Sequence, residues 1–227
     1  ILITFAWGKR LSKSWWLPCI GTLIMVLGPG TSIGSSVLLQ SPASALTLGW
    51  GLAFSLLLIA ILKSEIPIRR GAPVLFFLAI GLVGGKVTTA IVIAFGLVAL
   101  AISSIKKGLP NRSTPLIASA TGLFGIGLTY LLLIYSDVNR PITFGIFLGW
   151  PGLALSGLGA CVGLLTHSYR KFGRLDQLSV FSISIFISGA IASLVTYDPS
   201  GNQIYFIIGA VGICIIPSLI MLEKQIE

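Results

Sequence analysis

The chain has 227 residues, of which 55% are hydrophobic and only 9% are charged, and its mean hydropathy is +1.01. A soluble domain carries about 25% charged residues, so these values exclude an ordinary soluble protein. The formal net charge is +9, but the basic residues stand at the ends of apolar runs, where they act as topology signals facing anionic lipid headgroups. We therefore expect membrane lipids as partners and no nucleic acid.

In chain order, apolar runs separated by short polar stretches predict about eight membrane-spanning helices. The first residues, Ile1–Trp7, read as the tail of an apolar segment, so we expect the chain to be a fragment of a longer polytopic protein. Residues 1–227 are predicted to form one transmembrane domain, an all-α polytopic helical bundle. The expected spans are Ser14–Gly28, Ala45–Leu62, Ala72–Gly85, Val87–Ser103, Ser113–Tyr135, Thr143–Leu165, Leu178–Thr196 and Gln203–Leu222.

The stretch Ala72–Ser103 is predicted to be a short helical hairpin and not one long helix. Three cations precede it and three follow it, and cytoplasmic loops carry the excess of Lys and Arg, so the stretch must cross twice. Its turn, Gly84-Gly85-Lys86, then lies outside, below the lipid surface because the first arm rises only about 21 Å, and its glycines can supply positive φ. The flanking cations are Lys63, Arg69 and Arg70, then Lys106, Lys107 and Arg112.

The same alternation predicts a multipass protein of the cell membrane. Basic loops face the cytoplasm, and the turns at Lys86 and Asp198 face the outer side.

Lys86 is the first candidate for a binding residue. A nucleotide-binding phosphate loop is excluded, because Ile80 replaces its first glycine and Val87 its Ser or Thr. Lys86, the N–H groups of the following helix and the hydroxyls of Thr88 and Thr89 could still hold the phosphate of a lipid-linked substrate. The alternative is that Lys86 only snorkels to the outer headgroups.

A second candidate is the outer loop at 197–203 with the start of the last span. Asp198 could accept a proton or bind sugar hydroxyls, and Asn202, Gln203 and Tyr205 could hydrogen-bond them. An ordinary Asp-Pro-Ser-Gly turn explains several of these residues equally well. We expect no metal and no cofactor, because His167 stands alone and the three cysteines are far apart in sequence.

Two short stretches, Gly84–Thr89 and Gly201–Phe206, resemble elements of large actinobacterial multipass membrane proteins. Those proteins are similar to the C-type glycosyltransferases, which use polyprenyl-phosphate sugar donors. The resemblance implies that this chain is the later membrane half of an enzyme that transfers a sugar from a lipid-phosphate donor at the outer face. It also implies that Lys86 contacts the lipid phosphate and that Asn202, Gln203 and Tyr205 line the outer cavity.

Such enzymes carry an acidic catalytic residue in their first outer loop, and this sequence shows no equivalent Asp/Glu pair. Whether the chain is an enzyme therefore stays open. The first alternative is a transporter or flippase for a lipid or neutral solute. Ion-coupled transport usually requires an acidic residue in the middle of a span, and this sequence has none there. The second is a non-catalytic membrane scaffold subunit.

Overall fold

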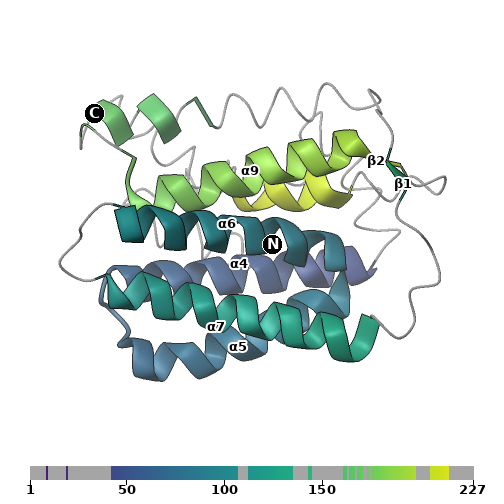
Figure 1. The fold of residues 1–227 in the computed structure, drawn as a ribbon, viewed down its shortest axis with the longest axis horizontal. Coiled ribbons are helices and arrows are strands. Elements are labelled where there is room, and N and C mark those ends of the chain that lie inside the picture. The colour runs from purple at the N-terminus through teal and green to yellow at the C-terminus, as the bar shows by residue number, and fades with distance from the viewer. Residues whose placement is uncertain are drawn as a thin grey trace.

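The computed structural model is a bundle of long helices (Figure 1). It describes residues 42–106, 112–134, 143–144, 161–162, 164–166, 168–170, 173, 175–197 and 205–214, with the single positions 9 and 19. Within these residues the helices are α4 (Pro42–Leu62), α5 (Ile68–Gly85), α6 (Val87–Lys106), α7 (Ser113–Thr129, continued by the π-helical turn η1, Tyr130–Ile134), α9 (Gln177–Val195) and the helix Tyr205–Cys214.

The described residues are almost entirely helical, as expected of an all-α fold, and four of the described helices are long and apolar enough to cross a membrane, which is compatible with an integral membrane protein. Two shorter apolar helices, Leu46–Leu62 and Tyr205–Cys214, match two further predicted spans. Most of the spans Ser14–Gly28 and Thr143–Leu165 lies outside the described residues, so the number eight stays a prediction. The four long spans are Ile68–Gly85, Val87–Ile105, Ser113–Leu132 and Gln177–Val195.

The predicted helical hairpin is present. α5 ends at Gly85, α6 begins at Val87, and the side chains of Leu82 and Ile93 both approach Gly51 of α4. Because residues on either side of the break meet the same point of α4, α5 and α6 run antiparallel. The region between the two helices is therefore a reversal of chain direction, as the alternation of charge required.

Two details of that hairpin were predicted wrongly. α5 begins at Ile68 and has 18 residues, so it rises about 27 Å and its turn is not deeply sunken. Arg69 and Arg70 belong to the first helical turn, where long cationic side chains can reach the headgroups. Among the described glycines only Gly173 has positive φ. The chain reverses instead through Lys86, which is extended (φ −151°, ψ 114°) while its N–H donates to Leu82 O at 3.1 Å.

Glycines set the close approaches between helices. The pair Gly81 and Gly85 of α5 faces Trp50 and Thr47 of α4, as small residues at a four-residue spacing allow. Gly96 of α6 similarly faces Phe181 and Ile185 of α9. Figure 1 shows α6 between α9 and α7, with α5 beyond α7.

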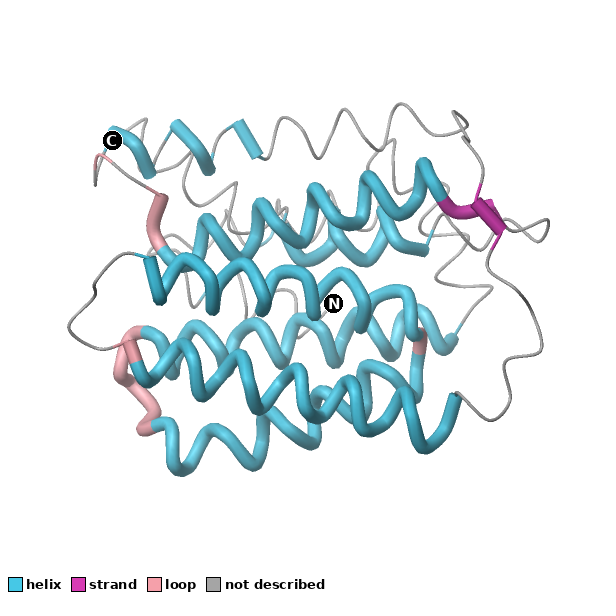
Figure 2. The backbone as a smooth tube through the Cα atoms, in the orientation of Figure 1, coloured by secondary structure: helices cyan, strands magenta, loops and turns pink. Residues whose placement is uncertain are grey.

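A two-residue antiparallel ladder joins β1 (Thr143–Phe144) to β2 (Thr196–Tyr197) beside the end of α9 (Figure 2). The spans expected to begin at Thr143 and to end at Thr196 are therefore extended at those positions. Pairing satisfies backbone groups that a helix end leaves without partners.

The two ends of the bundle differ in charge. Ser188 of α9 donates to Val92 O of α6 at 3.5 Å, and Gly96 lies against Phe181, so α6 and α9 run antiparallel. The start of α6 and the end of α9 therefore share one end, which we call the Lys86 end. The starts of α5, α7 and α9 lie at the other end, the basic end. Of the described cations, those at the basic end include Arg69, Arg70, Arg112 and Arg170.

Candidate functional site

The Lys86 side chain lies against the C-terminal part of the chain. Its Nζ is 3.4 Å from the centroid of the Tyr205 ring, at the first described residue of the helix Tyr205–Cys214. An ammonium over an aromatic face is a cation–π contact, which is worth more as the pair is withdrawn from water. Both side chains are half-buried. The structure thus brings together two of the predicted site residues from distant parts of the sequence.

Lys86 also stands where α6 begins. The N–H groups of the first helical turn, including those of Thr88 and Thr89, have no carbonyl of their own helix to bond. They carry the positive end of the helix dipole. The ammonium and these N–H groups make this a local concentration of positive charge at the Lys86 end.

Thr88 has an unusual environment. Its Oγ1 is buried and has no hydrogen-bond partner among the described residues. A buried hydroxyl without a partner costs about 1–3 kcal/mol, and such atoms in native structures call for an explanation. A polar group of a bound molecule would supply the missing partner.

Thr89 and Thr47 form the interior wall of this region. Thr89 is buried, and its Oγ1 would lie 2.9 Å from a Cβ added at Gly209. Thr47 is fully buried on α4, where its Oγ1 donates to Ala43 O at 2.6 Å. Because the Thr47 hydroxyl is aimed toward the end of α5, a side chain at Gly85 would collide with it. Four helices, α4, α5, α6 and Tyr205–Cys214, therefore meet around Lys86.

The structure brings Lys86, Thr88, Thr89 and Tyr205 to one end of the bundle. Their function as a binding site stays a prediction. Asp198, Asn202 and Gln203 lie outside the described residues, and so does His167.

A second buried hydroxyl, which sequence reasoning missed, belongs to Ser119 of α7. Its Oγ has no hydrogen-bond partner within the described part of the chain, and its side chain is 1% exposed. Gly122, one turn further along α7, faces Leu97 of α6. Thr88 precedes Leu97 by nine residues on α6, and Ser119 precedes Gly122 by three on α7, which runs in the opposite direction. At the helical rise per residue, Thr88 and Ser119 are therefore about 18 Å apart along the bundle axis. The two unpartnered hydroxyls therefore lie in opposite halves of the interior.

Sequence reasoning also missed a polar cluster at the basic end. Ser168 donates to Asp176 Oδ1 at 2.8 Å, and the Ser179 N–H donates to the same oxygen at 3.1 Å. Asp176 is thus the N-cap of α9. The signal that could have found it is an Asp two residues before the apolar run that begins at Leu178. All three groups are satisfied, so this cluster is structural.

No group of three or more His, Cys, Asp or Glu side chains that could hold a metal occurs among the described residues. Comparisons with models of protein families, with curated proteins and with solved structures found no match for this chain.

Proposed function

We propose that this membrane protein moves a phosphate-bearing lipid between the two leaflets, and that the phosphate binds at the Lys86 end. The observation that carries the proposal is the buried Thr88 hydroxyl, which has no partner among the described residues and belongs to the first turn of α6, two residues after Lys86. An ammonium, a hydroxyl donor and free helix N–H groups are the donors that a phosphate accepts from.

Two further features support translocation. The unpartnered hydroxyls of Thr88 and Ser119 lie in opposite halves of the interior, so a polar headgroup could find a donor in each half. Cations gather at the basic end, including Arg69 and Arg112, where a departing phosphate would meet the headgroup region. A phosphate that moves from Lys86 toward the basic end would thus meet the Ser119 hydroxyl and then these cations.

We further propose that the basic end faces the cytoplasm and the Lys86 end the outer side of the cell membrane. The segregation of described cations supports this orientation, because cytoplasmic loops carry the excess of Lys and Arg. A phosphate at Lys86 would then belong to a lipid of the outer leaflet.

The test is a flipping assay with purified protein in phosphatidylcholine vesicles. The probe is a fluorescent short-chain polyprenyl phosphate, and a membrane-impermeant quencher reports the fraction in the outer leaflet. We expect fast exchange in wild type and at least a tenfold slower rate in Lys86→Gln, with Arg170→Gln as the matched control at the other end. Exchange no faster than in protein-free vesicles would overturn the proposal.

Sugar transfer from the same lipid phosphate is the second candidate. The contact between Lys86 and Tyr205 favours it, because the donor phosphate would sit beside the loop that precedes Tyr205, where Asp198, Asn202 and Gln203 are candidates for sugar contacts. Vesicles loaded with a radiolabelled polyprenyl-phosphate sugar and acceptor glycan separate the two functions. Transfer gives a labelled glycan that depends on Asp198, whereas translocation gives redistribution of an unchanged lipid.

A further inference from the structure

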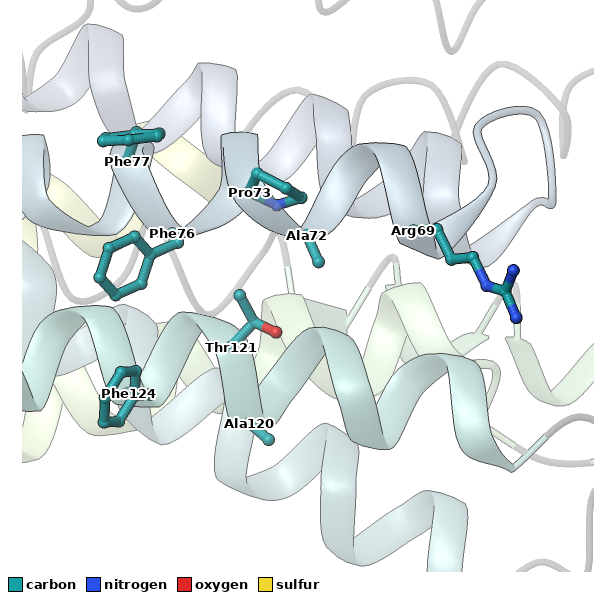
Figure 3. Close-up of a pocket in the computed structure, with 8 residues that line it drawn as sticks. All are labelled: Arg69, Ala72, Pro73, Phe76, Phe77, Ala120, Thr121 and Phe124. Carbon is teal, nitrogen blue, oxygen red and sulfur yellow. The ribbon is translucent and has the colours of Figure 1, made fainter.

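A shallow groove runs along the outer surface of the bundle between α5 and α7 (Figure 3). Its volume is about 540 Å³. Apart from Arg69 and Thr121 its walls are apolar, and its deeper end is formed by aromatic rings. The lining residues are Arg69, Ala72, Pro73, Phe76, Phe77, Ala120, Thr121 and Phe124.

The lining of the groove suits an acyl chain, because it is mostly apolar. Ala72 and Ala120 line it from opposite helices, and their small side chains take up little of its space. At its inner end the rings of Phe76 and Phe124 stack, with centroids 5.9 Å apart and planes at 24°. Phe77 and Phe124 are 67% and 64% exposed, so these rings present apolar surface to the hydrocarbon.

The length of the groove favours a lipid over a second copy of the chain. Arg69 and Phe77 are eight residues apart on α5, which corresponds to about 12 Å of rise. One leaflet of the hydrocarbon core is roughly 15 Å deep, so the groove spans most of one leaflet and ends at the rings. A helix from a second copy would need a path along the whole height of α5 and α7.

The charge at the open end indicates the headgroup. Arg69 is exposed at the mouth of the groove, and Arg70 and Arg112 lie at the same end of the bundle. A guanidinium binds a phosphate through paired N–H donors. Pro73 has no N–H, so the Arg69 carbonyl lacks its usual helical donor and can accept a bond from a headgroup hydroxyl.

We propose that this groove binds an anionic phospholipid of the leaflet at the basic end. One acyl chain lies between α5 and α7, and the phosphate pairs with Arg69. This site is separate from the Lys86 end and does not depend on the proposed function.

Native mass spectrometry of the purified full chain in detergent tests the site, with dioleoyl phosphatidylglycerol and dioleoyl phosphatidylcholine as probes. Arg69→Gln should lower the affinity for phosphatidylglycerol about fivefold, since one cation near the surface contributes about 1 kcal/mol. The loss for phosphatidylcholine should be smaller, because its choline cation offsets the charge of its phosphate. Ala120→Trp fills the groove and should lower the affinity for both lipids. The matched controls are Arg170→Gln, at the same end, and Ile187→Trp, on the exposed face of α9.

If Arg69→Gln and Arg170→Gln lower the affinity for phosphatidylglycerol equally, this affinity depends only on the overall charge of the protein, and the proposal is wrong. Unchanged lipid affinities in Ala120→Trp would also overturn it. The same spectra report the oligomeric state. If Ala120→Trp converts a dimer to a monomer without changing the lipid adducts, the occupant of the groove is a second copy and the lipid assignment is wrong.

Discussion

Gly85, the last residue of α5, lies directly against the hydroxyl of Thr47 on α4, and no side chain fits between them. This contact fixes the end of α5 on α4, just before the chain reverses at Lys86. Thr47 itself is held by its bond to Ala43 O. The position of the Lys86 ammonium therefore depends on a glycine one residue earlier.

We expect Gly85→Ala to destabilise the protein by about 1–3 kcal/mol, because inserting a methyl group into a packed contact forces the backbone to shift. Gly84→Ala is the matched control, since a Cβ there meets nothing within 4 Å and both changes gain similar helix propensity. Thermal unfolding in detergent, followed by tryptophan fluorescence, measures the difference. If both variants unfold at the same temperature, the contact with Thr47 does not limit stability.

The sequence was sufficient for those parts of the fold that hydropathy and charge determine. The apolar runs predicted α6, α7 and α9 to within a few residues, because the bilayer sets the length of a span. The alternation of basic loops predicted the reversal at Lys86, although the 32-residue run has no interrupting polar loop. The predicted start of α5 at Ala72 is too late, because Arg69 and Arg70 belong to the helix and not to the loop before it. Cations at a helix end and cations in a loop give the same signal in the sequence.

The site was only partly predictable. Lys86, Thr88 and Thr89 are neighbours in sequence, so a local pattern could group them. Their relation to Thr47 and Gly209 depends on which helices pack together, and hydropathy does not carry this information. The sequence predicts Tyr205 only as a residue of the outer polar region, and its contact with Lys86 is a consequence of tertiary packing.

The contact between Lys86 and Tyr205 predicts a difference between two substitutions. Tyr205→Phe keeps the aromatic face, so polyprenyl-phosphate exchange should stay within about twofold of wild type, because a phenyl ring also binds a cation. Tyr205→Leu removes the face and leaves the ammonium without its support. We expect it to slow exchange about three- to tenfold, which corresponds to roughly 0.7–1.4 kcal/mol. Equal effects of both substitutions in the vesicle assay would assign the role to the hydroxyl.

The proposed orientation predicts a labelling pattern. In a background with Cys19→Ser, which removes the exposed native thiol, Gly84→Cys should react in intact cells with a membrane-impermeant maleimide. Gly84 is exposed and open around its Cα. Ser113→Cys, exposed at the start of α7, should react only after the membrane is permeabilised. The reverse pattern would place the basic end outside and contradict the orientation.

Thr88→Val should separate stability from function. Valine has nearly the shape of threonine but no hydroxyl, so it removes a buried group that has no partner among the described residues. We expect the unliganded protein to gain about 1–2 kcal/mol of stability, while polyprenyl-phosphate exchange slows about tenfold because the phosphate loses a donor.

Thr129→Val provides the matched control, since that buried hydroxyl is already bonded to Gly125 O at 2.8 Å. Its loss should neither stabilise the protein nor slow exchange by more than about twofold, since its worth is that of one internal bond. Thermal unfolding without substrate gives the first quantity, and the vesicle assay gives the second. A Thr88→Val protein that is less stable than wild type would mean that the hydroxyl is satisfied in the folded chain. The Thr88 hydroxyl would then not be free to bind a ligand, and the proposed phosphate site would lack this donor.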